Sequence, residues 1–435
     1  MKKTTKDLTS LGLSRRGIYR ASLIGLLASA GLSLPHVASA QNLNLPSANE
    51  RTPEEYRPEP ILYNSFEISP SIGTDIEYID NVFSSDVNKV NDTVLSIRPS
   101  VLIRDRRDDR QISVRLLTGF ESYLDGTVSD RITLDLAGNA RFGIGTLTRT
   151  FVGANFREND TQGRGFSDTG SVGQPLSLSN YGGNFGIERD IGPYTALIEG
   201  RYRTTEFDGD IIINGQQFES SFRDFETLTG RGRLSYSVNP AQRIYAEVIY
   251  NDRDFSEPGA NSSLPINLLR DRSSDDISFL AGYTRQLTNV LQLDVNAGYI
   301  TQSFDDPTFL DQSSLTFNGA ILWDPTRLTS VQFRGSRSVD TTNDPFSAGL
   351  LRTEVGARLS HELKRNLIFD LGASYADLAT ADNTNNGSQI SAFGGARYLI
   401  SKKWSLRLRA EHFDQDIGFF SGSQSRLTFG ARYNF

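Results

Sequence analysis

The chain has 435 residues, no cysteine, one methionine and a formal net charge of −7 at pH 7. The lack of cysteine excludes a disulfide-bonded scaffold and any cysteine-based metal site, and the acidic balance argues against nucleic acid as a partner. After the N-terminal region no stretch approaches the roughly 18 consecutive apolar residues of a spanning helix. If the chain lies in a membrane, strands must hold it there.

The N-terminus has the pattern of a secretory signal peptide. Basic residues up to Arg20 precede an apolar stretch from Ala21 to Leu34, and Ala38, Ala40 and Gln41 fit a small-x-small cleavage site. We therefore expect residues 1–40 to be removed on export. This loss of six Lys/Arg and one Asp shifts the net charge from −7 to −12. A membrane anchor is the alternative, but the apolar stretch is shorter than the roughly 20 residues a spanning helix needs.

The segment 41–64 is polar, acidic and rich in proline, with Pro46, Pro53, Pro58 and Pro60. We predict a flexible lead-in on the periplasmic side. From residue 65 to residue 435 the sequence repeats another theme, in which every second side chain of a run is apolar. That period belongs to a strand and not to a helix.

The alternation is clearest from 291 to 299 and from 367 to 375, where apolar residues occupy every odd position. Counting such runs from Phe66 predicts about eighteen strands, within a range of 16–18. An even number returns the C-terminus to the periplasmic side, as single-chain bacterial barrels require. Pro70 and Pro99 fall inside the first two runs, where proline removes a ladder donor. The sequence thus predicts an all-β, transmembrane antiparallel up-and-down barrel over residues 65–435.

Short and long connections alternate along the chain, and this asymmetry separates an outer-membrane barrel from a soluble sandwich. The short ones, predicted to be periplasmic turns, fall around 143–146, 191–194, 239–242, 287–290, 324–328, 364–366 and 401–403. The long ones, predicted to be extracellular loops, fall around 80–92, 158–179, 207–223, 252–275, 304–313, 340–349, 379–388 and 414–423.

Aromatic residues near the strand ends predict two interfacial girdles. Trp323 and Trp404 lie beside predicted periplasmic turns, although a buried core tryptophan is the alternative. The outer girdle is predicted from Tyr78, Tyr123, Tyr250, Tyr299, Phe304, Tyr375 and Phe413. The last strand alternates Leu427, Phe429, Ala431 and Tyr433 and ends on Phe435. Such an ending resembles the assembly signal of outer-membrane proteins.

Several motifs resemble a family of outer-membrane β-barrel porins. They are Glu77 to Phe83, Trp323 to Thr326 with Arg337-Ser338-Val339, and His361-Glu362-Leu363 followed by Arg365-Asn366-Leu367. The resemblance runs from about Glu55 to the terminal strand and keeps the family's order. It implies the barrel fold and an association with exopolysaccharide or capsule production. It supplies no catalytic or binding residue.

Charged residues on the polar faces of the predicted strands are the candidate lining of the lumen. Pairing across strands would stabilise the wall, and the alternative is a charged constriction that selects anionic or sugar solutes. The candidates are Arg115, Arg141, Arg201, Arg203, Arg231, Arg233, Arg334, Arg358, Arg397, Arg407, Arg409, Arg432, Glu121, Asp135, Glu199, Asp294, Asp370 and Glu411.

The sequence offers little for catalysis or metal binding. His412 stands near Glu411, Asp414 and Asp416, faintly like the acid–histidine sites of outer-membrane proteases, but no nucleophile motif accompanies it. His361, beside a turn, fits an interfacial position. Carboxylates at 252, 254, 271, 275 and 276 could hold Ca²⁺, although solvated loop charges are the simpler explanation. No phosphate-binding loop or dinucleotide fingerprint is present, and we expect no cofactor and no enzymatic activity.

The leading hypothesis is a bacterial outer-membrane barrel whose lumen passes polar solutes, with exopolysaccharide export as its specific form. The alternative is a closed structural or adhesive barrel without transport. The expected partners are outer-membrane lipid and lipopolysaccharide, the barrel-assembly machinery and polysaccharide export components.

Overall fold

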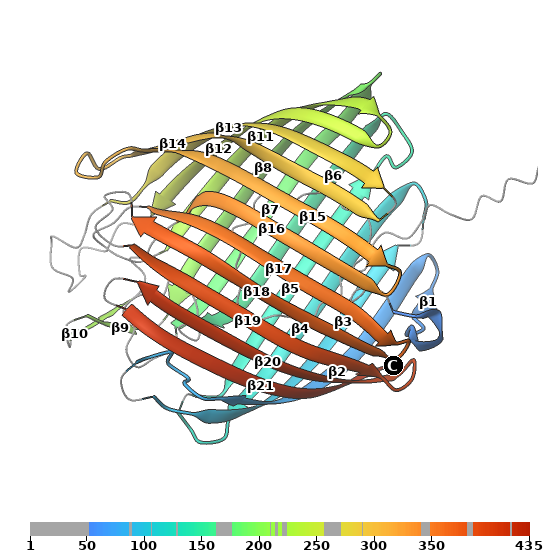
Figure 1. Cartoon of the computed structure of the whole chain (residues 1–435), viewed down its shortest axis with the longest axis vertical. Coiled ribbons are helices and arrows are strands. Elements are labelled where there is room, and N and C mark those ends of the chain that lie inside the picture. The colour runs from blue at the N-terminus through green and yellow to red at the C-terminus, as the bar shows by residue number, and fades with distance from the viewer. Residues whose placement is uncertain are drawn as a thin grey trace, which may run out of the picture.

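The first and last barrel strands pair with each other and close the sheet on itself (Figure 1). The computed structural model describes residues 52–86, 89–105, 107–127, 129–161, 176–208, 210–213, 216–219, 224–255, 271–288, 290–340, 349–380, 386–417 and 420–435. Every neighbouring pair of strands in the wall is antiparallel, and β2 pairs with β21 at the seam. Closure leaves no unpaired strand edge.

Eighteen strands form the wall, which confirms the predicted fold class and strand number. They are β2 (Phe66–Ile79), β3 (Asp92–Asp105), β4 (Arg110–Tyr123), β5 (Arg131–Phe142), β6 (Thr148–Thr161), β7 (Leu176–Ile191), β8 (Tyr194–Asp208), β11 (Phe225–Asn239), β12 (Gln242–Phe255), β13 (Ser274–Thr288), β14 (Leu291–Phe304), β15 (Gln312–Thr326), β16 (Thr329–Asp340), β17 (Leu350–Lys364), β18 (Leu367–Thr380), β19 (Asn386–Leu399), β20 (Trp404–Ile417) and β21 (Phe420–Asn434).

Three short elements lie outside the wall: the 3-10 turn η1 (Glu54–Tyr56), the strand β1 (Ile61–Tyr63) and a hairpin of β9 (Asp210–Ile213) with β10 (Gln216–Glu219). The hairpin belongs to the connection between β8 and β11. Within the described part of the chain no helix is long and apolar enough to span a membrane.

The alternation of the sequence becomes the two faces of the wall. In β11, Leu228, Leu234 and Tyr236 point outward and are exposed, while Arg231 and Ser235 between them point inward and are buried. Successive side chains of a strand face opposite sides, so the apolar set of each strand forms one continuous outer surface. That surface meets the hydrocarbon of a membrane, and the polar set encloses the lumen.

The connections differ in length between the two ends of the barrel. At one end, which we call the turn end, neighbouring strands are separated by two to five residues, as at 192–193 and 143–147. Gly143, Gly145 and Gly192 there have positive φ, a backbone conformation that is costly for a residue with a side chain. The opposite end, the loop end, carries the longer connections (Figure 1). This confirms the predicted asymmetry, and the turn between β3 and β4, described at 107–109, adds one short turn that the sequence prediction lacked.

One predicted long loop, 414–423, is wrong. β20 continues to Ile417 and β21 resumes at Phe420, and Asp414 and Asp416 pair with Ser423 and Ser421. These polar residues resemble a loop in composition, but strands of this barrel continue beyond the apolar band, where both faces are polar. Composition alone therefore places the end of the apolar band and not the end of the strand.

Both tryptophans lie on the outer face at the turn end, where the inner girdle was predicted. Trp404 packs on Tyr433 with ring centroids 4.9 Å apart, and Tyr194 packs on Tyr236 at 5.2 Å. At the loop end Tyr78, Tyr250, Tyr299 and Tyr375 also face outward.

Three members of the predicted outer girdle face the lumen instead. Tyr123 shares the inward register of Glu121, and Phe304 that of Gln302. Phe413 shares the inward register of Glu411. The prediction is wrong for these three because the aromatic type alone does not reveal a residue's face, whereas its parity along the strand does.

Proline is accommodated in the first two wall strands. Pro70 pairs with Val101 and Pro99 pairs with Ile72, and the ladder between β3 and β4 is interrupted beside Pro99, between Ile97 and Ser100. The wall strands begin at Phe66 and end at Asn434.

Part of the predicted flexible lead-in has regular structure. β1 folds back on β2, pairing Ile61 with Ile68. Upstream, Glu55 accepts a hydrogen bond from Arg365 at 3.0 Å, and Glu59 forms an ion pair with Lys402. Both basic residues lie at turns of the C-terminal half, so the segment is held under the turn end. The predicted signal peptide, with Ala38, Ala40 and Gln41, lies outside the described residues.

Candidate functional site: the inner wall of the barrel

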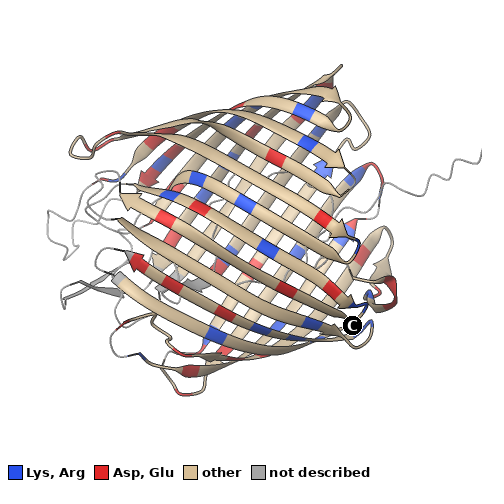
Figure 2. Ribbon diagram, in the orientation of Figure 1, with Lys and Arg blue, Asp and Glu red and all other residues tan. Residues whose placement is uncertain are grey.

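Charged residues recur along the strands of the wall (Figure 2). Those predicted to line the lumen all lie on inward registers of the wall strands. On each strand they alternate with the exposed apolar residues of the outer face. The set is Arg115, Arg141, Arg201, Arg203, Arg231, Arg233, Arg334, Arg358, Arg397, Arg407, Arg409, Arg432, Glu121, Asp135, Glu199, Asp294, Asp370 and Glu411. Most of these residues form ion pairs or ring contacts with their neighbours on the wall.

A ladder of ion pairs crosses β8, β11 and β12. Glu199 accepts from Arg201 at 3.1 Å and from Arg231 at 3.3 Å, and Glu247 bridges Arg231, at 2.8 Å, to Arg233. Arg231 and Glu247 expose only 3% and 1% of their side chains. Because each carboxylate serves two guanidinium groups and is itself inaccessible, this ladder is part of the wall.

Other charged pairs follow the same rule on neighbouring strands. Asp135 of β5 accepts from Arg115 at 2.8 Å and from Arg157 at 2.9 Å. Near the turn end Arg149 holds both Glu188 and Asp190, the latter at 2.6 Å. Arg358 and Asp370 form a two-point pair across β17 and β18. Such cross-strand pairs stabilise a sheet wall.

Arginines also cover the inward aromatic rings. The guanidinium of Arg233 lies 4.1 Å from the ring centre of Tyr245, and that of Arg409 lies 4.1 Å from the ring centre of Phe393. The Tyr245 hydroxyl in turn donates to Asp294 at 3.3 Å. Stacking of a guanidinium on an aromatic ring is favourable and fixes the orientation of the guanidinium. The rings are therefore covered by cations on the lumen side.

The seam of the barrel carries a different arrangement, centred on Asp75 of β2. Its carboxylate accepts from Arg98 at 2.5 Å and from Arg407 at 2.7 Å, and Arg98 also reaches Glu121 at 3.0 Å. Asp75 exposes 6% of its side chain, whereas Arg98 and Arg407 expose 26% and 24%. The carboxylate therefore lies beneath the guanidinium groups, which face the lumen.

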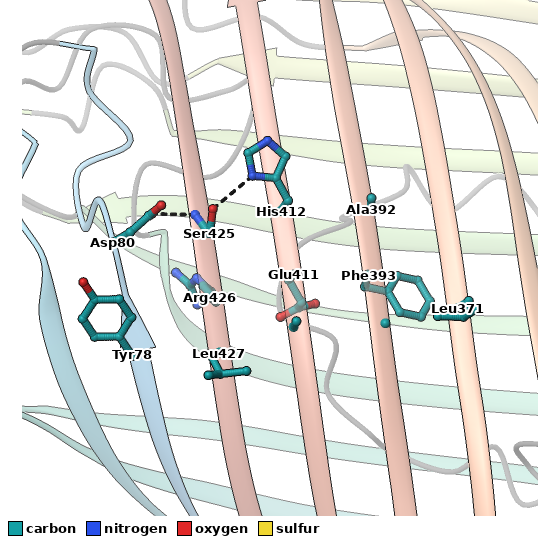
Figure 3. A pocket seen from close by; sticks show the side chains of 12 residues that line it. Tyr78, Asp80, Leu371, Ala392, Phe393, Glu411, His412, Ser425, Arg426 and Leu427 are labelled. Carbon is teal, nitrogen blue, oxygen red and sulfur yellow. Dashed lines mark hydrogen bonds between the residues drawn. The ribbon is translucent and has the colours of Figure 1, made fainter.

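A groove opens on the outer face toward the loop end, over β18 to β21 and β2 (Figure 3). Small residues, Ala392, Gly394 and Ala410, form its floor. His412 lies at its upper edge, where its Nδ1 is 3.1 Å from the Ser425 hydroxyl. Asp80 accepts a hydrogen bond from the backbone N–H of Ser425 at 2.6 Å and not from the imidazole.

The predicted cluster around His412 is not assembled. Glu411 lies on the inner face and pairs with Arg409 at 2.9 Å, while His412 lies on the outer face. Among the described residues no carboxylate forms a hydrogen bond with His412, so the orienting acid of a Ser–His–acid triad is missing. His361 also faces outward, with its Nδ1 3.0 Å from the Thr329 hydroxyl, in the interfacial position expected for it.

The five aspartates considered for Ca²⁺ do not form a metal site either, although Asp252 and Asp275 lie opposite each other on β12 and β13. Asp275 faces outward and accepts from the Tyr250 hydroxyl, whereas Asp276 faces inward and accepts from Asn251 at 2.8 Å. Burial, with repulsion from carboxylates including Asp271 and Asp275, raises the pKa of Asp305 above its usual range. Within the described ranges no group of three or more His, Asp or Glu side chains is arranged to hold a metal ion.

Comparison with known proteins decides the family. The family model described as Putative beta-barrel porin 2 matches residues 53–434, which is most of the chain. The chain belongs to this family. An eighteen-stranded barrel of a porin family lies in the bacterial outer membrane, with its short turns toward the periplasm. No protein of curated function matches the sequence.

Solved structures resemble the porin only distantly. OccAB4 of Acinetobacter baumannii is 12% identical, with 85% of this chain and 98% of that chain covered and a TM-score of 0.46. OpdO of Pseudomonas aeruginosa is 12% identical, with coverages of 86% and 98% and a TM-score of 0.47. The ferric-catecholate import receptor Fiu of E. coli is 11% identical, with coverages of 87% and 82% and a TM-score of 0.43. Similarities of this size carry no argument about what the porin transports.

Sequence reasoning missed several charged residues of the porin's inner wall. Arg98 was missed although it shares the inward register of Ser96, between the outward residues Leu95 and Ile97. Alternation would have revealed it, but Pro99 beside it made the strand look irregular. Further inward residues missed from the candidates include Asp75, Glu77, Arg149, Arg157, Glu188, Asp190, Arg352 and Arg426.

The lumen of the porin is not polar over its whole height. Near the loop end Ile79, Val82, Val94 and Tyr123 form an inward apolar cluster between β2, β3 and β4. A second cluster joins Leu350 of β17 to Ala376 and Leu378 of β18. Toward the extracellular mouth, the charged band of the inner wall is therefore followed by two apolar patches.

The C-terminal strand of the porin presents its apolar residues to the outside. Leu427, Phe429, Tyr433 and Phe435 all face outward, and the rings of Tyr433 and Phe435 meet edge to face at 5.0 Å. These are the residues predicted as the assembly signal, and their exposure makes them available to a partner.

Proposed function

We propose that the barrel is an aqueous pore for polar solutes. The observation that supports it is the inner wall, where guanidinium and carboxylate groups follow one another from strand to strand around a ring of eighteen strands. Barrels of 16–18 strands are wide enough to leave a water-filled channel. Polar groups on that wall are best solvated by water. Small hydrophilic solutes can then pass through the same water-filled lumen.

A more specific form of the proposal is the export of an exopolysaccharide, which the family resemblance raised. An acidic polysaccharide carries carboxylates at regular intervals, and the accessible arginines at the seam, Arg98 and Arg407, suit such groups. In this form the pore works with polysaccharide export components that deliver the polymer to its periplasmic mouth.

A closed barrel with a structural or adhesive role is the second candidate, and two observations favour it. Many inward charges are paired with each other, as in the ladder through Glu247. The apolar cluster around Ile79 and Tyr123 also gives infolded loops a surface to pack on. In this case the loops contact partners outside the cell and no solute passes.

Two partner surfaces accompany either candidate. The outer aromatic girdle, including Tyr78 and Tyr250, would meet outer-membrane lipid and lipopolysaccharide. We further propose that the outward face of β21, with Phe429 and Phe435, is recognised by the barrel-assembly machinery.

Conductance of the mature protein separates the candidates. Residues 41–435 would be refolded in detergent and inserted into a planar bilayer, with circular dichroism and heat-modified gel mobility as controls of folding. The pore predicts stable ohmic steps, and the export form predicts that alginate added on the periplasmic side blocks them. Folded protein that shows no steps would overturn the pore and leave the closed barrel.

A further inference from the structure

At the seam of the barrel, the inward arginines outnumber the inward carboxylates beside them. In one row across the sheet Arg397 of β19 lies directly opposite Arg407 of β20, and the row continues through Gly430 of β21 to Asp75 of β2. In the next row toward the turn end Arg432 and Arg98 flank Gly73. Arg98, Arg407 and Arg432 thus surround Asp75, and Arg397 lies beside Arg407 and Arg432 on the side of Asp370.

The neighbouring carboxylates do not restore the balance. Glu121 pairs with Arg98 at 3.0 Å, and Asp370 accepts hydrogen bonds from Nε and Nη2 of Arg358. Among the described residues no carboxylate lies within ion-pair distance of Arg432, whose charged neighbours are Arg407, Asp75 and Arg98. Glu77 also acts on Arg98, but it forms an ion pair with Arg426 at 2.9 Å. Counting Arg358 and Arg426 with the four arginines, six guanidinium groups face four carboxylates.

The close contact at the centre depends on a glycine. A Cβ at Gly430 would lie 1.9 Å from the Asp75 carboxylate and 2.9 Å from Nε of Arg407. Only a residue without a side chain lets Asp75 and Arg407 meet across the intervening strand. Gly73 in the adjacent row leaves the space between Arg98 and Arg432 without a side chain, and that space faces the lumen.

Like charges placed opposite each other weaken a sheet, so the arrangement opposes the stability of the wall. Breaches of a local rule of this kind occur in proteins mainly at functional sites. Guanidinium groups present planar pairs of N–H donors that match the oxygens of carboxylates and phosphates. An oxyanion resting on the exposed arginines would supply the negative charge that the cluster lacks.

We propose that Arg98, Arg407 and Arg432, held around Asp75, together with the adjacent Arg397, form an oxyanion-binding site in the lumen near its periplasmic mouth. Arg397, Arg407 and Arg432 lie within three residues of the turn-end limits of their strands. The ligand class is a carboxylate or phosphate group carried by a solute. This deepens the proposed pore by naming its preferred solutes, and it rests on that function for its role in transport but not for binding itself.

Titration with small oxyanions tests the site. Inorganic phosphate and citrate would be titrated by calorimetry into the mature protein in detergent, one as the phosphate arm and one as the carboxylate arm. In the double variant Arg397→Gln/Arg432→Gln we expect binding to weaken about tenfold or more, because a hydrogen bond to a charged group contributes about 1.5–3 kcal/mol. Gel mobility and circular dichroism would show that the variant folds.

Two controls locate the effect. Arg337→Gln removes the same charge from the outer face and should leave both titrations unchanged. Arg201→Gln removes an inward arginine that is paired with Glu199, six strands along the ring from β2. A loss in Arg201→Gln as large as in the double variant, or no binding of either anion by the wild type, would overturn the proposal.

Binding and conduction separate this site from the pore. Binding in detergent without conductance would keep the site and overturn the pore. Conductance with no anion binding and no change of ion selectivity in Arg397→Gln/Arg432→Gln would keep the pore and overturn the site.

Discussion

Two parts of the wall, the strands β8, β11 and β12 and the seam around β2 and β21, use the same residue types differently. On β8, β11 and β12 each carboxylate bridges two arginines, and Arg231 and Glu247 are almost wholly inaccessible. At the seam a single buried carboxylate, Asp75, lies beneath arginines that reach the lumen. The ratio of charges and their access to water, and not the presence of arginine, distinguish a supporting ladder from a binding surface.

The largest effect is expected from breaking the ladder. Glu247→Gln leaves Arg231 and Arg233 without their shared carboxylate, and removing one partner of a buried ion pair costs about 3–5 kcal/mol. Urea unfolding followed by the fluorescence of Trp323 and Trp404 would measure the loss. The matched control is Glu411→Gln, whose pair with Arg409 is partly exposed and contributes about 1 kcal/mol or less. Equal losses in both variants would contradict the comparison.

A smaller loss is expected from crowding the seam. Gly430→Ala places a methyl group between Asp75 and Arg407, and overpacking of a close contact costs about 1–3 kcal/mol. The same unfolding experiment measures it. Gly232→Ala is the control, because a Cβ at Gly232 meets nothing within 4 Å. If the two glycine variants are equally stable, the close approach at the seam is not needed.

Removing the central carboxylate should make the pore more selective for anions. Asp75→Asn takes away the one negative charge among the seam arginines, so the chloride-to-potassium permeability ratio should rise. A unit charge about 4 Å from an ion in water contributes about 1 kcal/mol, which limits the change to about fivefold. Reversal potentials in a salt gradient would show it. Arg432→Gln must shift the ratio the opposite way, and a shift of the same sign would refute the assignment.

The smallest effect concerns the segment under the turn end. The hydrogen bond and charge of Lys402 hold the pKa of Glu59 below its ordinary value of 4.5. The bound state therefore favours the carboxylate, so this contact contributes fully above the unfolded pKa and is lost as the pH falls through the lower, folded value. Limited proteolysis of residues 52–60 should accelerate below that pH in the wild type. In Glu59→Gln the rate should be faster at neutral pH and vary less between neutral and acidic pH, and a variant that retains the wild-type pH profile would disprove the assignment.

Much of the fold follows from the sequence because lipid and lumen impose a period of two on every strand. The runs beginning at Leu291 and Leu367 became β14 and β18 with the predicted faces. Errors arose where that constraint ends. Beyond the apolar band, Asp414 and Ser423 are polar yet lie in paired strands, and Tyr123 was assigned by residue type when its parity with Glu121 places it inside.

The seam cluster could not be predicted in the same way. Alternation places Arg407, Arg432 and Asp75 on inward faces one at a time. Their meeting depends on the register between the first and last wall strands, which pairs Asp75 with Gly430 across most of the chain. No local pattern encodes that register, because it results from closing the whole ring. The sequence therefore predicted a charged lumen but not which of its charges share a site.

The N-terminal segment has a consequence for the order of assembly. Its contacts from Glu55 to Arg365 and from Glu59 to Lys402 join residues 310 and 343 positions apart. Each contact joins the start of the chain to its C-terminal half, as the seam between β2 and β21 also does. Both contacts are therefore expected to form when the seam closes, and a pair of fluorophores placed across one of them would time that closure, separately from the insertion of the strands.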